Sequence, residues 1–132
     1  MDSIKVYTNN NARTIIKGIM GNVNSDDKQY IKQWLNDVII KCYCYFYENK
    51  IVSFALLSKC DYDPLNEYSN PYILNYIYTF EQYRRKSFVS SILDKVKKSE
   101  TVTAFCSNDI SEKLLEKNGF SYIDGICCYR YP

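Results

Sequence analysis

The sequence predicts one α+β domain over residues 1–132, in which a mixed and mostly antiparallel sheet is flanked by helices. Segments with strand and helix patterns follow one another in the order β-α-α-β-β-β-α-β-α-β-β, a mixture typical of α+β folds. Residues 39–59 have the pattern of a hairpin, which makes antiparallel pairs. Residues 72–98 have the pattern of a strand followed by a helix, and this crossover adds one parallel pair.

The N-terminal part of the chain predicts a strand and two helices. Residues 4–8 alternate between polar and apolar types and indicate a strand. The asparagines at 9–11 are predicted to cap a helix over 12–20. A second helix is expected to begin at residues 25–27, where a serine cap and two acids suit the positive end of a helix. The apolar stripe of this second helix consists of Ile31, Trp34, Leu35 and Val38.

The predicted hairpin joins two strands, 39–47 and 51–59, across a turn at 48–50 in which Asn49 tolerates the tight geometry. A loop at 60–70 follows, longer than a hairpin needs. The loop is acidic, and its charged residues are Asp61, Asp63 and Glu67.

The second half of the chain predicts, in order, a strand at 72–80, a helix from Ser87, a strand at 101–106, a helix from Asp109 to Gly119, and strands at 122–123 and 126–131. The strand at 72–80 is almost entirely apolar or aromatic, which favours a buried position. Asp109 and Glu112 have the spacing of a capping box, and the Asn-Gly pair at 118–119 favours the end of that helix.

Composition narrows the class of protein. Hydrophobic residues make up 46% of the 132, which is enough for a globular core. The net charge of +2 is too small to indicate nucleic-acid binding, and no basic-aromatic RNA motif is present. No run approaches the roughly 18 apolar residues of a membrane span, and the first ten residues do not resemble a signal peptide. We therefore expect a cytoplasmic protein without a membrane or nucleic-acid partner, in the host cytoplasm if its tyrosine- and asparagine-rich composition marks a viral source.

The six cysteines do not predict a metal site. None forms a Cys-x-x-Cys pair, and the chain has no histidine, which excludes the common mixed zinc sites. In a cytoplasmic protein a disulfide framework is not expected either. We expect reduced cysteines that pack in the core, and no metal.

Three cations, Arg84, Arg85 and Lys86, lie at the predicted start of the helix that follows the strand at 72–80. Free N–H groups and the positive end of the dipole favour an anion there. The segment is therefore a candidate phosphate-binding loop. The alternative is an ordinary strand-to-helix loop whose cations are only solvated.

Two segments resemble one family. The run IYTFEQYRRKSFV at 77–89 resembles the strand and pyrophosphate loop of the GNAT superfamily of N-acetyltransferases. That loop has the pattern Gln/Arg-x-x-Gly-x-Gly/Ala, which places Arg84 first, Ser87 at the first glycine and Val89 at the second. The run SNDISEKLLEKNGF at 107–120 resembles the late helix of the family, which carries an Asn near its start and ends in Glu-Lys-x-Gly-Phe. With the order of elements, the resemblance covers nearly the whole chain.

The resemblance implies a GNAT-like acyl-CoA N-acyltransferase fold, in which the fourth and fifth strands splay apart and acetyl-CoA, the co-substrate, inserts its pantetheine between them. It also implies transfer of the acetyl group to a primary amine of a small molecule, peptide or protein by direct attack. A basic acceptor would be drawn to the acidic loop, and a homodimer remains open. The positions that the resemblance assigns to the cofactor are Ile77, Tyr78, Thr79, Arg84, Arg85, Lys86, Ser87, Phe88, Val89 and Asn108.

The catalytic residues are not evident from the sequence. The family often has a proton-donating tyrosine in the late helix, and Leu115 stands at that position. Neither predicted strand 72–80 nor 101–106 contains a carboxylate, although an amine must lose its proton before it attacks. Asn75 could hold a water for that proton, or be a satisfied buried amide or bulge residue, and Tyr78 is a candidate relay. These departures leave a second function open, a degenerate GNAT-like domain that acts through protein–protein interaction.

Overall fold

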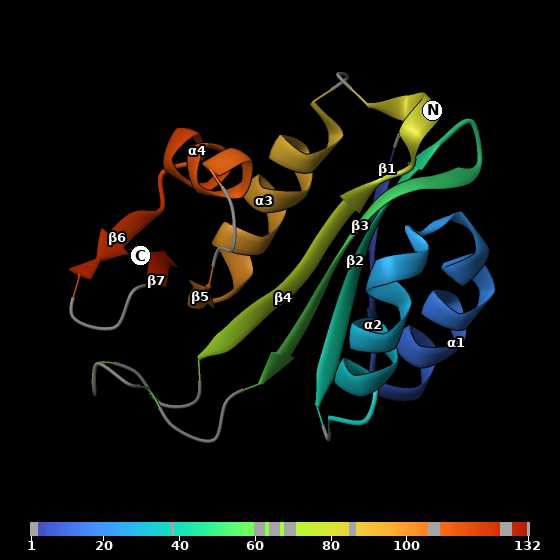
Figure 1. Ribbon diagram of the computed structural model, residues 1–132, viewed down its shortest axis with the longest axis horizontal. Helices are drawn as coiled ribbons and strands as arrows, with labels where there is room; N and C mark the ends of the chain where they lie inside the picture. The colour runs from blue at the N-terminus through green and yellow to red at the C-terminus, as the bar shows by residue number, and fades with distance from the viewer. Residues whose placement is uncertain are drawn as a thin grey trace.

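The computed structural model describes residues 3–37, 39–59, 63, 67, 71–84, 87–105, 109–124 and 128–131 (Figure 1). Its elements occur in the predicted order. They are β1 (Ser3–Thr8), α1 (Asn9–Ile19), α2 (Lys28–Trp34), β2 (Ile40–Tyr47), β3 (Lys50–Lys59), β4 (Tyr72–Thr79), α3 (Phe88–Ser99), β5 (Val102–Ala104), α4 (Asp109–Lys117), β6 (Ser121–Ile123) and β7 (Cys128–Tyr131). None of the described helices is long and apolar enough to cross a membrane.

The strands form one mixed sheet in the order β1-β2-β3-β4-β5-β7-β6. Every pair of neighbours is antiparallel except β4 and β5, which are parallel. This confirms the predicted fold class and its single parallel pair. The crossover from β4 to β5 contains α3, as a parallel connection requires.

Helices cover both faces of the sheet, and each face has its own core (Figure 1). Successive side chains of β3 alternate between the two cores, because a strand points its residues to opposite faces. Phe54 and Leu56 join the core beneath α1 and α2, whereas Ala55 and Leu57 join the core beneath α3. β3 is therefore buried on both faces, and β4 beside it lies at the centre of the molecule.

The predicted hairpin is confirmed, with a two-residue turn at Glu48 and Asn49. Both residues have positive φ angles, 50° for Glu48 and 65° for Asn49. Two positive φ angles match the twist of the flanking strands. Asparagine tolerates this conformation well, as predicted, but glutamate adopts it less readily.

The predicted helix caps near the N-terminus are wrong in detail. The first helix begins at Asn9 rather than after the asparagines, and the side chain of Asn9 accepts a hydrogen bond of 3.1 Å from the backbone N–H of Ile40. That contact ties the start of α1 to the start of β2. Before the second helix, the side-chain cap is Asn24 rather than Ser25, and it caps a 3₁₀ turn by accepting from the backbone N–H of Asp26 at 3.0 Å. A 3₁₀ turn at Ser25–Asp27 then leads into α2.

The C-terminal half follows the predicted order of elements, with some differences in their bounds. The fifth strand spans Val102–Ala104 rather than 101–106, and the side chain of Phe105 is exposed. The predicted end of the last helix is confirmed, because Gly119 has a φ of 89° and Phe120 N–H donates to the carbonyl of Leu115 at 3.0 Å. This is a left-handed C-cap of the kind that glycine favours.

The described cysteines support the core prediction. Cys42, Cys44 and Cys128 are buried, and the sulfur atoms of Cys42 and Cys44 lie 3.4 Å apart on one face of β2. The other three cysteines lie outside the described residues. Among the described residues, no group of three or more Cys, Asp or Glu side chains is placed to hold a metal.

Candidate active site

The sheet opens between β4 and β5. The two strands pair only at their beginnings, Tyr72 with Val102 and Ile73 with Thr103. Beyond Ile73, β4 continues for six more residues to Thr79, while β5 ends at Ala104 (Figure 1). The predicted splay between these strands is therefore confirmed.

A cavity of about 590 Å³ occupies this opening. Its size falls within the usual range for ligand sites. β4 supplies one wall, β5 with Phe105 and α4 supply another, and α2 with the turn before it supplies the third. The lining residues are Asp27, Tyr30, Trp34, Leu74, Asn75, Tyr76, Ile77, Tyr78, Ala104, Phe105, Ser111, Leu114 and Leu115.

The backbone of β4 presents to the opening groups that have no partner on a neighbouring strand. Phe80 N–H donates to the carbonyl of Val52 at 2.9 Å, so Phe80 faces β3. Because N–H and C=O directions alternate along a strand, the backbone groups of Ile77 and Thr79 face away from β3. They point to the side where β5 is missing. An extended ligand with amide groups can pair with such an edge.

Asn75 lies at a β-bulge. Leu56 pairs with Tyr76 and Leu57 pairs with Leu74, so Asn75 between them has no partner on β3. Its side-chain amide donates to the hydroxyl of Ser58 at 2.8 Å. Both features match the alternative that the sequence left open, a satisfied amide at a bulge. The contact to Ser58 gives Asn75 a structural role, although it also lines the cavity.

Asp27 supplies a carboxylate that the sequence analysis missed. It lies just before α2, and its Oδ2 accepts a 2.6 Å hydrogen bond from the hydroxyl of Tyr76 on β4. The pKa of Tyr76 is raised strongly above its ordinary value. Burial is the largest cause, and the hydrogen bond to Asp27 is the second. Tyr76 therefore remains protonated at every physiological pH and acts as a hydrogen-bond donor rather than as a base.

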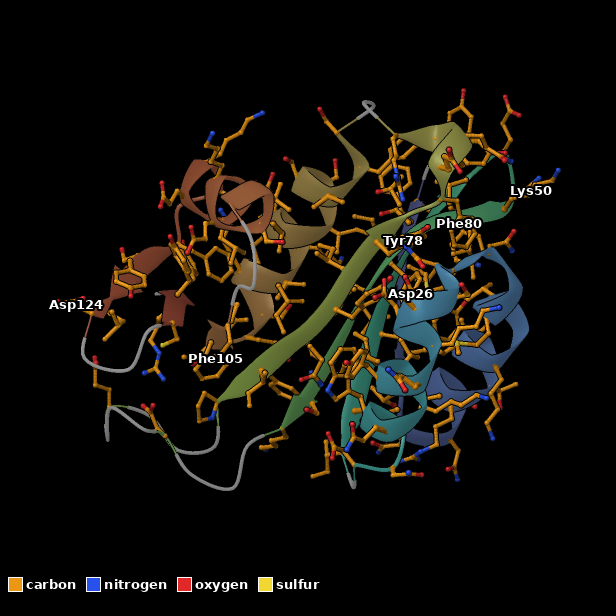
Figure 2. All side chains as sticks on the ribbon, viewed as in Figure 1. Asp26, Lys50, Tyr78, Phe80, Phe105 and Asp124 are labelled. Carbon is orange, nitrogen blue, oxygen red and sulfur yellow. The ribbon has the colours of Figure 1, made fainter. Side chains whose placement is uncertain are left out.

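Asp27 lines the cavity together with several aromatic side chains. The rings of Tyr30 and Trp34 lie 6.2 Å apart, those of Trp34 and Tyr76 lie 6.0 Å apart, and Tyr76 stacks on Tyr78 at 5.7 Å. Figure 2 shows Tyr78 and Phe80 on the side of β4 that faces α2. A carboxylate within an aromatic wall suits a cationic group, because ring faces and the carboxylate both attract positive charge.

The start of α3 has one residue in the left-handed conformation. Ser87 has a φ of 59°, in the left-handed region, at the position where the resembling family has glycine. Ser91 N–H donates to the carbonyl of Ser87 at 3.3 Å, which begins the helix. The preceding N–H groups of the first turn have no partner within the helix, as in any α-helix. These donors are available to an anion.

The remaining predicted cofactor residues occupy different environments. Arg84 is exposed, donates to the carbonyl of Thr79 at 3.1 Å and lies over the ring of Tyr78 at 5.2 Å. The buried Phe88 ring stacks on Tyr45 at 4.4 Å, and the half-buried Val89 packs against the core beneath α3. The side chains of Phe88 and Val89 therefore face the protein, and only their backbone N–H groups can reach an anion. Arg85, Lys86 and Asn108 lie outside the described residues.

Asp63 of the acidic loop pairs with Arg130 inside the protein. The Asp63 carboxylate is 4% exposed and makes an ion pair with the Arg130 guanidinium, including a hydrogen bond of 2.9 Å from Nη1. Its charge is compensated inside the protein and is not open to a substrate. Glu67 is exposed, and the other residues of the loop at 60–70 lie outside the described residues.

No protein-family model and no curated protein matches the sequence. Solved structures do match. A GNAT-family protein from Desulfovibrio desulfuricans superposes with a TM-score of 0.71 at 9% identity over 98% of both chains. A polyamine N-acetyltransferase from Drosophila melanogaster, which forms N-acetylagmatine, has a TM-score of 0.69 at 10% identity over 94% of this chain and 85% of its own. An aminoglycoside N-acetyltransferase solved with CoA has a TM-score of 0.63 at 19% identity over 89% of this chain and 91% of its own. The chain therefore has the fold of the GNAT acetyltransferases.

Proposed function

We propose that the protein is an N-acetyltransferase that transfers the acetyl group of acetyl-CoA to a primary amine. The observation that best supports this is the opening between β4 and β5, which joins an unpaired strand edge to a cavity that contains one carboxylate among its described lining residues. The strand edge suits the amides of pantetheine, and the start of α3 suits its diphosphate. A structural neighbour solved with CoA supports the same use of the fold. We further propose that the protein acts in the cytoplasm, that of the host if its source is viral.

Acetyl-CoA would lie along β4. Its pantetheine would pair with the backbone of Ile77 and Thr79, and its diphosphate would meet the first N–H groups of α3, near Phe88 and Val89. Ser87 already has the left-handed conformation that this turn needs, so glycine is not required there. In this arrangement the thioester reaches the cavity beside Asn75 and Tyr78.

The acceptor amine would enter from the side of α2. Asp27 would attract its ammonium group, and the rings of Tyr30 and Trp34 would contact its positive charge. A cationic amine suits this end of the cavity better than a neutral one. The polyamine acceptor of one structural neighbour is of this chemical type.

In the reaction, the ammonium first gives a proton to the Asp27 carboxylate or, through water, to solvent. The neutral nitrogen then attacks the thioester carbonyl carbon, a C–N bond forms and the C–S bond breaks. The nitrogen then loses a second proton to water to become the amide, and the CoA thiolate leaves and takes a proton. Leu115 cannot supply that proton, which must come from Tyr78 or from water. Tyr76 holds the Asp27 carboxylate in place throughout.

The proposal is tested by measuring CoA thiol release from acetyl-CoA with spermidine, a lysine-containing peptide and a neutral amine as acceptors. Asp27→Asn should lower kcat/KM by about 10²–10⁴-fold, the usual contribution of general acid–base catalysis. Asp26→Asn is the matched control, because Asp26 is the adjacent acid and does not line the cavity. We expect that control to retain most of the activity.

Two outcomes would contradict parts of this proposal. Equal activity of Asp27→Asn and the natural protein would show that another group accepts the proton. No transfer to any amine, together with no binding of acetyl-CoA, would instead favour a degenerate GNAT-like domain that acts through protein contacts.

A further inference from the structure

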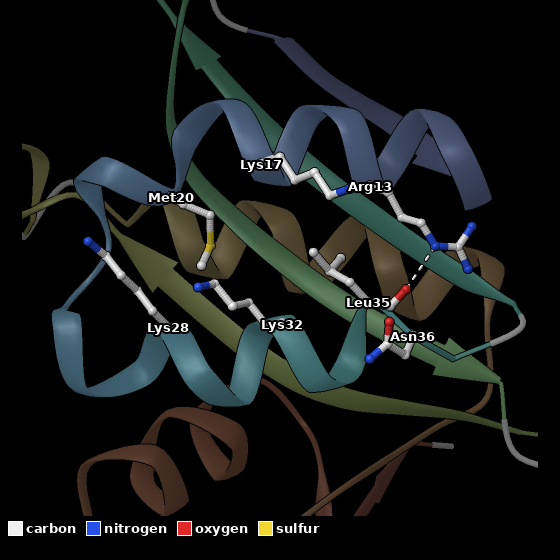
Figure 3. A pocket seen from close by; sticks show the side chains of 7 residues that line it. All are labelled: Arg13, Lys17, Met20, Lys28, Lys32, Leu35 and Asn36. Atoms are coloured by element: carbon white, nitrogen blue, oxygen red, sulfur yellow. Dashed lines mark hydrogen bonds between the residues drawn. The ribbon is translucent and has the colours of Figure 1, made fainter.

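A second and larger hollow, of about 880 Å³, lies between α1 and α2 (Figure 3). We call it the basic groove. Its cations are Arg13 and Lys17 from α1 and Lys28 and Lys32 from α2. Figure 3 shows the side chains of Met20 and Leu35 pointing into the space between the two helices. The groove therefore combines an apolar floor with basic walls.

The cations form two facing rows. Arg13 and Lys17 are four residues apart on α1, and Lys28 and Lys32 are four residues apart on α2. Residues at this spacing are neighbours on one helix face, and like charges there destabilise a helix. An anion that lies between two such pairs relieves the repulsion of both.

Only one of the four cations has an evident structural role. Arg13 donates from Nε to the carbonyl of Leu35 at 2.8 Å and from Nη2 to the carbonyl of Asp37 at 2.5 Å, which secures the end of α2. Lys17, Lys28 and Lys32 make no ion pair or hydrogen bond with any residue that the structure describes. Three uncompensated ammonium groups thus line one concave surface.

The lining distinguishes between classes of anionic partner. Single-stranded nucleic acids bind by stacking bases on aromatic side chains, and none of the described residues that line the groove is aromatic. An anionic membrane surface attracts exposed basic segments, whereas this site is concave. Carboxylates that flank an apolar side chain match both the lysines and the floor, where the flexible Met20 can adapt to the inserted group.

We propose that the basic groove binds an acidic segment of a partner protein. An apolar side chain of that segment lies over Met20 and Leu35, and its carboxylates pair with Lys17, Lys28 and Lys32. The site is separate from the cavity between β4 and β5, and it goes beyond the proposed acetyl transfer. The partner is defined by this chemistry, acidic residues on both sides of a leucine-like group.

Fluorescence anisotropy with a labelled octapeptide, in which pairs of glutamates alternate with single leucines, tests the proposal. We expect saturable binding that Lys28→Ala with Lys32→Ala weakens by about tenfold or more, since both removed charges face the peptide. Lys113→Ala with Lys117→Ala is the matched control, because these exposed lysines have the same spacing on α4. The control should bind the peptide normally, and both double variants should bind acetyl-CoA like the natural protein.

A second comparison tests the apolar floor of the basic groove, which Met20 and Leu35 form. Replacing the leucines of the peptide by serine should weaken its binding to the natural protein. In the Met20→Ser variant, the affinities of the leucine peptide and the serine peptide should differ less. The proposal would be overturned if the Lys28/Lys32 and Lys113/Lys117 double variants lost peptide affinity equally. It would also be overturned if the natural protein did not bind the peptide. Tighter binding of an oligothymidylate or of phosphatidylserine vesicles, lost in the Lys28/Lys32 variant, would also overturn it and assign the groove to that partner.

Discussion

The hydroxyl of Tyr76 donates a 2.6 Å hydrogen bond to Oδ2 of Asp27, although 49 positions separate the two residues in the chain. The contact joins the start of α2 to the middle of β4 at the wall of the cavity. It fixes one oxygen of the carboxylate and leaves the group within the aromatic wall. Asp27 is in this way oriented toward the place where an acceptor amine would enter.

This hydrogen bond should make the stability of the fold depend on pH above about pH 10. Burial and Asp27 raise the pKa of Tyr76, so the folded protein keeps a proton that the unfolded chain loses there. The folded state then binds more protons, and its free energy of unfolding falls as the pH rises. We expect Tyr76→Phe to lower the free energy of unfolding by about 1 kcal/mol at neutral pH. A hydrogen bond to a charged group usually contributes more, but water weakens this one because the pair is half-exposed.

Urea unfolding at neutral pH and above about pH 10 measures this effect. The difference in free energy of unfolding between the natural protein and Tyr76→Phe should shrink as the pH rises. Only the natural protein loses the contribution of the Tyr76 proton. Tyr30→Phe is the control, since Tyr30 is 50% exposed. A difference that stays constant with pH would show that the Tyr76 hydroxyl is not coupled to folding.

Ser87→Gly should stabilise the protein by about 0.5 kcal/mol. A non-glycine residue in the left-handed region costs about 1–2 kcal/mol, and the greater flexibility of unfolded glycine offsets part of that gain. Ser87 has a φ of 59°, whereas Ser90 lies within the regular helix α3. The same change at Ser90 should therefore destabilise the protein by about 0.5 kcal/mol. Equal effects at both positions in urea unfolding would contradict a strained turn at Ser87.

Leu115→Tyr should keep or mildly raise the rate of acetyl transfer. Leu115 is buried at the cavity wall, at the position where the resembling family has its proton-donating tyrosine. A phenol there could protonate the CoA thiolate, at a cost of about 1–3 kcal/mol of stability for the larger ring. Leu115→Phe adds the same ring without the hydroxyl and should be slower than the Tyr variant. A Phe variant as fast as the Tyr variant would exclude proton donation from this position.

Asp63→Asn should destabilise the fold by about 3–5 kcal/mol, because it leaves the Arg130 charge buried without its partner. Arg130 is only 2% exposed and also donates to Thr103 on β5 at 2.9 Å. Glu67→Gln, on the exposed side of the same loop, should change the free energy of unfolding by less than about 0.5 kcal/mol. A loss below about 1 kcal/mol for Asp63→Asn would mean that water or another group replaces the carboxylate.

Local patterns in the sequence were sufficient to predict most of the fold. The hairpin, the strand that becomes β4 and the left-handed end of α4 follow from alternation, aromatic content and an Asn-Gly pair, which act over a few residues. The cap of the first helix is predicted wrongly because Asn9 uses its side chain to bind Ile40, a contact across 31 positions. Local propensity does not carry that information.

The candidate site was predicted less completely than the fold. From the sequence, a base is expected on one of the two central strands, and neither of them contains a carboxylate. Asp27 reaches the cavity from another element, and its contact with Tyr76 depends on how α2 packs on β4. An acid that follows a helix cap is usually explained by the helix dipole, so the sequence offered no separate signal for this role. The bulge at Asn75, by contrast, is one of the alternatives predicted from the sequence. A polar residue in an otherwise apolar strand suggests either a bulge or an amide that is hydrogen-bonded inside the protein.

The most direct test of the account is a titration of ¹⁵N-labelled protein with acetyl-CoA, followed in amide ¹H–¹⁵N spectra. Binding between β4 and β5 should produce saturable shifts at the amides of Ile77 and Thr79 and in the first turn of α3, at Phe88 and Val89. The amides of β1, at the far edge of the sheet, should remain unchanged. Spectra without shifts, or with shifts confined to the basic groove, would contradict the placement of acetyl-CoA in the opening of the sheet.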